Sequence, residues 1–131
     1  QVTEIHGNAT YAVCLDCSKK FELSDIHAQY TNTKKSPTCD VCSGPIKTAT
    51  ISFGQSLIAE DLLRSEQSIH ECDLLMAIGT TLTVGPINRV VPLAHSLGKP
   101  IFILNGEPTE YDGLASYLLR ADISSTLQKI C

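Results

Sequence analysis

The stretch Leu74-Leu-Met-Ala-Ile78-Gly79-Thr80-Thr81 decides the expected fold, because a continuous apolar run stopped by glycine is typical of a strand buried on both faces. A second apolar run, Ile101-Phe-Ile-Leu104, ends at Asn105-Gly106. Between these runs, apolar residues at helical spacing from Ile87 to Leu97 predict a helix, whose regular part should begin close to Pro92. The pattern therefore predicts a strand, a helix and a second, parallel strand.

The segment upstream of this unit predicts one more strand and one more helix. Thr48-Ala-Thr-Ile-Ser-Phe53 is rich in β-branched residues and stops at Gly54. Leu57, Ile58, Leu62 and Leu63 then follow at helical spacing. The whole order is β-α-β-α-β, so we expect an α/β fold with three parallel strands, one mononucleotide-binding half of a Rossmann-like sheet.

Ligands of such sheets bind beyond the carboxyl ends of the strands. There, Gly79-Thr80-Thr81 offers a turn with two hydroxyls, and Asn105-Gly106-Glu107 offers an amide and a carboxylate that suit ribose hydroxyls. Each turn alone is also ordinary turn chemistry, but two of them at adjacent strand ends favour a nucleotide. The sequence contains no G-x-G-x-x-G motif and no P-loop, so we expect only half of a nucleotide-binding domain.

Four of the six cysteines form two close pairs, Cys14-x2-Cys17 and Cys39-x2-Cys42, separated by 21 residues. This spacing is typical of a four-thiolate zinc site in which two tight turns meet around one tetrahedral ion. We expect residues 14–47 to form a small zinc-ribbon module, with residues 1–13 and 48–131 forming an incomplete Rossmann-like part. A site closed by four thiolates is structural and does no Lewis-acid chemistry.

Two alternatives for the paired cysteines are two disulfides in a secreted protein and a redox role. We favour zinc because the rest of the sequence has the pattern of an intracellular α/β enzyme, and because two matched pairs fit one shared ion. Cys72 and Cys131 stand alone, and we interpret them as a buried small residue and a chain-terminal thiol.

A histidine near the start of the chain is a candidate for proton transfer. Val2-Thr-Glu-Ile5 alternates like a short strand and leads into His6-Gly7, which would place an imidazole at a strand end. The alternative is a surface or packing residue, and this is the interpretation we give to His27, His70 and His95.

Composition limits the remaining function classes. The chain has 131 residues, of which 43% are hydrophobic, which is enough for one buried core. Ten basic and fourteen acidic residues give a net charge of −4, which argues against direct nucleic-acid binding. No apolar run approaches the roughly 20 residues that span a bilayer, and no leader opens the chain. We expect an intracellular, cytoplasmic protein without membrane contact.

The motifs together carry a resemblance to a known family. They are, in order, Ile5-His-Gly7, the paired cysteines, Ile51-Ser-Phe-Gly-Gln55, Ile78-Gly-Thr-Thr-Leu-Thr-Val84 and Asn105-Gly-Glu-Pro-Thr109. From about Val2 to Leu127 the chain resembles the C-terminal part of the catalytic core of a sirtuin. Sirtuins are NAD-dependent protein-lysine deacylases, which release nicotinamide and transfer the acyl group to ADP-ribose.

The resemblance implies a role for each motif. It makes His6 the general base that takes a proton from a ribose hydroxyl, with NAD and Zn²⁺ as cofactors and an acyl-lysine protein or peptide as substrate. The implied zinc ligands are Cys14, Cys17, Cys39 and Cys42. The implied NAD contacts are Gly79, Thr80 and Thr81 on the adenosine side, Asn105, Gly106 and Glu107 at the adenine ribose, and Ala121 at the adenine. Phe53 and Gly54 would pair with the substrate peptide as an added strand.

The chain departs from the family pattern in three places. Gln55 replaces a common Glu, and Ile58 replaces a common Pro. The glycine-rich loop and the Gln-x-x-Asx segment, which contact NAD in sirtuins, are absent. We therefore expect the upstream half of the same catalytic domain as partner, and little turnover without it. The alternatives are an NAD hydrolase or ADP-ribosyltransferase of the same superfamily, and a non-catalytic zinc-ribbon interaction module.

Overall fold

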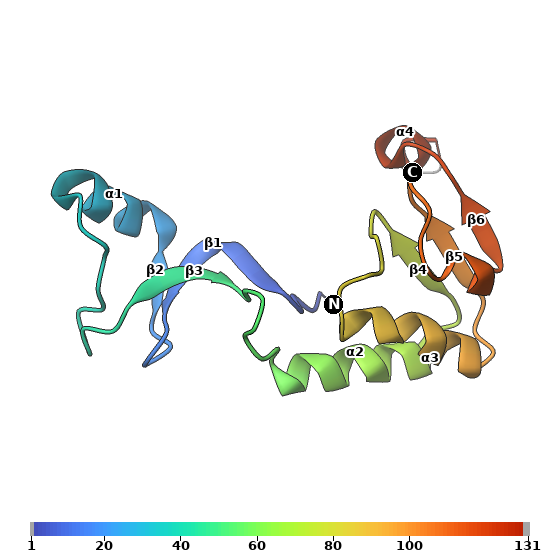
Figure 1. The fold of residues 1–131 in the computed structure, drawn as a ribbon, viewed down its shortest axis with the longest axis horizontal. Helices are drawn as coiled ribbons and strands as arrows, with labels where there is room; N and C mark the ends of the chain where they lie inside the picture. The colour runs from blue at the N-terminus through green and yellow to red at the C-terminus, as the bar shows by residue number, and fades with distance from the viewer. Residues whose placement is uncertain (1, 130–131) are drawn as a thin grey trace. The chain divides into compact units, whose positions relative to one another are not determined.

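The computed structural model describes residues 2–129, so the predicted thiol of Cys131 lies outside the described residues. The chain divides into two compact units, which we call the N-terminal unit (Gln1–Ile58) and the C-terminal unit (Ala59–Cys131). Each unit has its own sheet (Figure 1). We describe the two units separately.

The N-terminal unit is an antiparallel sheet with one helix. Strand β1 (Gly7–Cys14) lies between β2 (Lys20–Glu22) and β3 (Ile46–Thr50), and helix α1 (Leu23–Thr33) follows β2 (Figure 1). The pairing of β1 with β3 places Cys14 opposite Ile46, and an irregularity in register further along places Gly7 opposite Thr50. Among the described residues of α1, no side chain is buried. The sheet therefore has very little apolar core of its own.

The C-terminal unit contains a parallel sheet. Its strands β4 (Leu75–Ile78), β5 (Ile101–Leu104) and β6 (Tyr117–Leu119) lie side by side in chain order. Its α-helices are α2 (Ala59–Glu71), α3 (Val90–Ser96) and α4 (Ile123–Leu127), with the short 3₁₀ helices η1 (Ile87–Arg89) and η2 (Asp112–Leu114). Pro92 lies in the first turn of α3, as expected, because a missing backbone N–H is harmless there.

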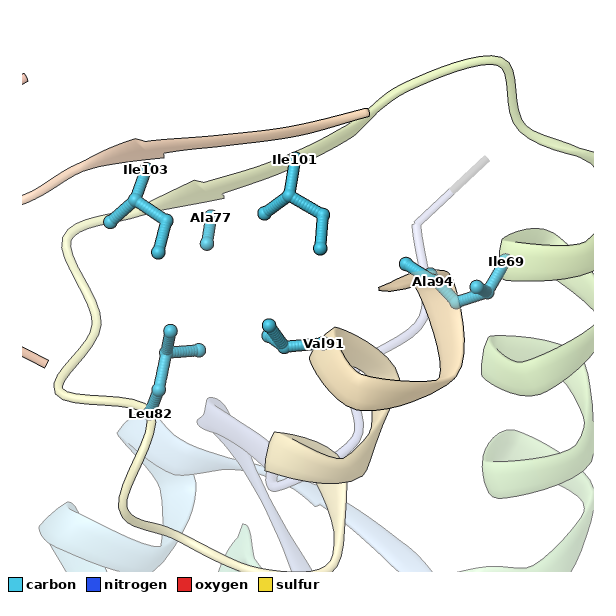
Figure 2. Packing of buried hydrophobic residues seen from close by; sticks show 7 residues of the cluster. All are labelled: Ile69, Ala77, Leu82, Val91, Ala94, Ile101 and Ile103. Carbon is cyan, nitrogen blue, oxygen red and sulfur yellow. The ribbon is translucent and has the colours of Figure 1, made fainter. Parts of the chain in front are cut away.

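One face of this sheet packs against α3 and the end of α2. Side chains that alternate along the strands point to this face, and Ala77, Ile101 and Ile103 meet Val91 and Leu82 there (Figure 2). Ile69 of α2 packs beside Ala94 of α3 in the same cluster (Figure 2). The second apolar run, in β5, is therefore the centre of this core. The first run was predicted to be buried on both faces, but β4 buries only Ala77 fully, and Met76 and Ile78 on its other face are exposed.

The predicted fold class is confirmed, with three corrections to the predicted strands. The predicted strand 48–53 overlaps β3 only at residues 48–50, and β3 pairs antiparallel with β1 rather than parallel with β4. Residues 51–53 lie beyond the strand, and Phe53 is in a turn. The third parallel strand is β6, which the sequence analysis missed because it is three residues long and exposed. Residues 2–5 are not a strand either, since β1 begins only at Gly7.

The sheet of the N-terminal unit extends beyond the predicted zinc module, because β1 begins before residue 14 and β3 ends after residue 47. The predicted Rossmann-like part combines residues 1–13 with residues 48–131, which belong to both units. This grouping stays a prediction. Among the described residues, no helix has both the length and the apolar character required to cross a membrane.

The buried core gives a first test. Ile103 is fully buried between β4 and β6, so Ile103→Ala should lower the free energy of unfolding by about 2–5 kcal/mol, measured by urea unfolding. The matched control is Leu63→Ala on α2, where the side chain is 66% exposed and the change should be small. Equal effects at the two positions would contradict this description of the core.

Candidate functional site

Four cysteine side chains converge in the N-terminal unit. The Sγ atoms of Cys14, Cys17, Cys39 and Cys42 all lie within 4.8 Å of one another. The closest pairs are Cys14 with Cys42, at 3.4 Å, and Cys17 with Cys39, at 3.6 Å. A tetrahedral zinc ion with bonds of about 2.3 Å to sulfur requires sulfur separations of about 3.8 Å. The cluster is therefore compatible with zinc.

Two equivalent turns hold these sulfur atoms. The backbone N–H of Ser18 donates to the carbonyl of Cys14 at 3.0 Å, and Ser43 donates to Cys39 in the same way at 2.8 Å. Ser18 and Ser43 both have φ near 60°. The two Cys-x2-Cys segments thus fold into matching turns, as the spacing predicted.

None of the four cysteines forms a disulfide in the structure, and each thiol changes the pKa of its neighbours. The backbone N–H of Cys17 is the main cause that lowers the pKa of Cys14 to about 7. The Gly44 backbone N–H favours the Cys42 thiolate, but the neighbouring thiols Cys14 and Cys17 outweigh it and raise the pKa of Cys42 to about 12. Four thiolates at this spacing would repel one another unless a cation lay between them. No disulfide links these cysteines in the structure, since the Cys14 and Cys42 sulfur atoms lie 3.4 Å apart, against about 2.05 Å in a disulfide.

His6 lies in the turn that precedes β1, and its side chain is exposed. Its carbonyl accepts a hydrogen bond from the Ile51 backbone N–H at 2.9 Å, just after β3. Gly7 permits this close pairing, since a Cβ there would lie 2.0 Å from the Ala49 carbonyl oxygen. The N-terminal unit therefore places His6 beside the segment that carries Phe53 and Gly54.

The predicted NAD-contacting turns converge in the C-terminal unit. Ile78, Leu104 and Leu119 are paired neighbours across the sheet, so the residues that follow them leave the same edge. Gly79 follows the first of these strands with φ +62°, and a Cβ there would lie 2.8 Å from the Ile123 side chain. Thr80 is half-buried and accepts a hydrogen bond from the Leu82 backbone N–H at 3.1 Å, while Thr81 is exposed.

The turn after β5 has a buried anchor and exposed polar groups. Asn105 is buried, and its side-chain amide donates to the Glu107 carbonyl at 2.8 Å. Gly106 and Glu107 are exposed. Ala121 follows β6 at the same edge of the sheet and is half-buried. The register of the parallel sheet thus brings together all seven residues predicted to contact NAD.

Two supporting residues, Arg120 and Asp112, were not predicted from the sequence, and Thr109 was quoted there only as the end of a motif. Arg120 donates to the Asn105 carbonyl at 3.3 Å and forms an ion pair with Asp112. Asp112 in turn accepts from the Thr109 hydroxyl at 2.6 Å. The Thr109 hydrogen bond and the Arg120 pair hold the pKa of Asp112 below its ordinary value. These contacts form because β5 and β6 are neighbouring strands, so they could not be predicted from a local sequence pattern.

The cysteine cluster gives the second prediction. Cys39→Ser should abolish stoichiometric zinc binding and the cooperative unfolding of the N-terminal unit, because a three-thiolate site with one hydroxyl binds zinc far more weakly. Zinc content by metal analysis and thermal unfolding measure the two effects. Cys72→Ser is the matched control, because Cys72 lies outside the cluster and should leave one zinc per chain. A cooperatively folded, metal-free wild-type unit would contradict the prediction.

The supporting network gives the third prediction. Because the pKa of Asp112 is lower in the folded chain, its carboxylate stabilises the fold above the unfolded value of about 3.9, and this contribution is lost as pH falls through the folded pKa. Asp112→Asn should therefore lower the melting temperature at pH 6 and have a smaller effect at pH 3. The control is Asp73→Asn at an exposed position, which shows how much the loss of any surface carboxylate changes the melting temperature at each pH. If Asp112→Asn lowered the melting temperature by the same amount at pH 6 and at pH 3, the stabilising role of the carboxylate would be refuted.

Comparisons with known proteins agree with this arrangement. Residues 1–86 match the model of the Sir2 family. The NAD-dependent protein deacetylase of Rhodopseudomonas palustris is 42% identical over 126 residues, covering 96% of this chain and 50% of the relative. The NAD-dependent protein deacetylase 1 of Bradyrhizobium diazoefficiens is 40% identical, covering 96% and 49%. The chain thus spans about half the length of these relatives.

Solved structures show the same fold. One described as "Structural Basis for the Mechanism and Regulation of Sir2 Enzymes" has a TM-score of 0.84 at 27% identity, covering 99% of this chain and 52% of that chain. Another, "Sir2 bound to acetylated peptide", has a TM-score of 0.92 at 23% identity, covering 99% and 54%. The resemblance seen in the sequence motifs is confirmed, and the chain belongs to the Sir2 family, the sirtuins.

Proposed function

We propose that this chain is the C-terminal part of an NAD-dependent protein-lysine deacylase, which releases nicotinamide and transfers the acyl group to ADP-ribose. The observation that carries the proposal is the backbone hydrogen bond from the Ile51 N–H to the His6 carbonyl, which holds the residue with an exposed imidazole beside the exposed residues 52–55. The names of the curated relatives support the same reaction.

NAD, when bound, supplies the ribose carbon that accepts the acyl oxygen as nicotinamide leaves. The residues at the carboxyl edge of the parallel sheet fit its adenosine part, because they offer exposed hydroxyl and carboxylate oxygens beside a buried amide. In the proposal, Gly79, Thr80 and Thr81 hold the adenosine side. Asn105, Gly106 and Glu107 hold the adenine ribose, and the Ala121 backbone contacts the adenine.

His6 acts as the general base in this proposal. Imidazole suits proton transfer near neutral pH, and the exposure of His6 leaves its ring free to reach a ribose hydroxyl. Taking that proton would make the ribose oxygen a nucleophile toward the carbon of the acyl group. The backbone bond to Ile51 fixes the position of His6 relative to the substrate-facing segment.

Phe53 and Gly54 are proposed to bind the acyl-lysine peptide by strand addition. This mode uses backbone hydrogen bonds, so the receptor segment must be exposed. Phe53 is 96% exposed, and Gly54 is exposed as well. Related solved structures described as bound to an acetylated and to a propionylated peptide support an acyl-lysine substrate.

The zinc ion is proposed to be structural, because all four of its positions would be filled by Cys14, Cys17, Cys39 and Cys42. The upstream half of the catalytic domain is proposed to complete the NAD site, since the curated relatives are about twice as long as the matched region. In that domain, residues 14–47 form the zinc module, and residues 1–13 and 48–131 belong to the NAD-binding part. Absence of direct nucleic-acid binding and a cytoplasmic location stay predictions.

The reaction is tested with the complete zinc-loaded polypeptide, NAD and an acetyl-lysine peptide, by measuring nicotinamide and the deacetylated peptide. Nicotinamide release should require the peptide and match deacetylation one to one. His6→Ala should lower turnover by at least about 100-fold, with zinc content unchanged, because a general base contributes at least that factor. His95→Ala, which changes an exposed histidine on α3, is the control and should keep full activity.

Other outcomes separate the alternatives. Nicotinamide release without peptide would favour an NAD hydrolase, and transfer of ADP-ribose to protein would favour an ADP-ribosyltransferase. A zinc-loaded protein that releases no nicotinamide would favour the non-catalytic zinc-ribbon module. Full turnover by His6→Ala would refute the assignment of the general base.

A further inference from the structure

Lys47 lies in β3, and its ammonium group meets three oxygen acceptors in the segment that ends and follows the strand. Its Nζ donates to the Thr50 carbonyl at 2.6 Å, to the Ser52 hydroxyl at 2.9 Å and to the Gln55 Oε1 at 2.7 Å. An ammonium group has three N–H donors, so these contacts use its whole donor capacity. Lys47 therefore holds residues 50–55, which we call the 50–55 turn, at three points.

Gln55 closes the same turn from its other end. The Gln55 Oε1 also accepts a hydrogen bond from the Ser52 backbone N–H at 2.8 Å. The backbone N–H of Gln55 donates to the Ser52 carbonyl at 3.0 Å. One side-chain oxygen is thus shared between the backbone of the turn and the Lys47 ammonium. The side-chain oxygen of Gln55 accepts hydrogen bonds as a glutamate carboxylate would, so glutamine at this position preserves the contact with Lys47.

Packing does not fix the tip of the 50–55 turn. Phe53 is 96% exposed, and Ser52, Gly54 and Gln55 are exposed as well. A segment without buried side chains keeps its conformational freedom unless polar contacts order it, and ordering on binding would weaken the affinity for a ligand. The Lys47 and Gln55 contacts are therefore the interactions that give this turn a defined shape.

We propose that Lys47, acting through Gln55 and the Thr50 carbonyl, is a positioning residue that presents Phe53 and Gly54 to the acyl-lysine peptide. The inference rests on the proposed function. The hydrogen bond between Ile51 and His6 is made by the backbone and does not involve Lys47. Loss of the Lys47 contacts should therefore weaken peptide binding and spare the chemical step.

Lys47→Met in the complete zinc-loaded polypeptide tests this, because methionine keeps a long apolar chain and removes the donors. The KM for an acetyl-lysine peptide should rise about tenfold, the factor expected for losing hydrogen bonds to a charged group. The kcat at saturating peptide and the KM for NAD should change less than about twofold, since only uniform binding is lost. Lys47→Arg should restore the KM for the peptide, because guanidinium also donates to several acceptors.

Two further variants keep the test decisive. Gln55→Leu removes the shared acceptor and should raise the KM for the peptide like Lys47→Met, whereas Gln55→Glu should keep it near the wild-type value. Lys35→Met, at an exposed loop position, is the matched control and should change nothing. Zinc content and thermal unfolding of each variant report folding.

The outcomes distinguish the inference from the function on which it rests. An active wild-type protein whose peptide KM is unchanged in both Lys47→Met and Gln55→Leu would overturn the positioning role and leave the proposed function intact. A fall in kcat at constant peptide KM would overturn it as well. An inactive wild-type protein would overturn the proposed function and this inference together.

Discussion

The convergence of four thiols on one point is the constraint on which the N-terminal unit depends. Among its described residues, the buried apolar side chains are Ala12, Cys14 and Cys39, two of which belong to the cluster itself. A sheet with so little apolar core needs another source of cohesion, and metal–thiolate bonds supply folding free energy directly. Cys14 ends β1 opposite Ile46, so closing the cluster also fixes how β1 meets β3. Beyond an irregularity in register, the same two strands lead to the contact between the His6 carbonyl and the Ile51 N–H.

The sequence predicted those elements whose signal is local. Cysteine spacing predicted the cluster, and the runs ending at Ile78 and Leu104 predicted the two central parallel strands. The error concerned residues 48–53, whose β-branched pattern predicts a strand but carries no information about its partner. Pairing with β1 follows from the cysteine cluster, which is a contact between distant parts of the chain. Strand β6 is too short and too exposed for any periodic pattern to predict it.

The same distinction applies to the candidate site. The turns at Gly79 and Asn105 were predictable, because glycine and short polar residues after a buried strand mark the edge where ligands bind. The residues that hold these turns and the 50–55 turn in shape were not. Arg120 reaches Asn105 across fifteen positions, and Lys47 reaches Gln55 across eight. Arginine and lysine are common on protein surfaces, so only the fold distinguishes these two from other basic residues.

The two units therefore depend on different physical interactions, and each interaction supports a different part of the proposed chemistry. An apolar core under β4 and β5 fixes the turns that would hold the adenosine part of NAD. The cysteine cluster and a polar network hold the backbone at His6 and the 50–55 turn. Disrupting the cysteine cluster should act on the second set through β1 and β3, while a cavity in the apolar core should act on the first. Since each set is ordered by its own unit, the proposed peptide binding and the proposed nucleotide binding should be separable by mutation.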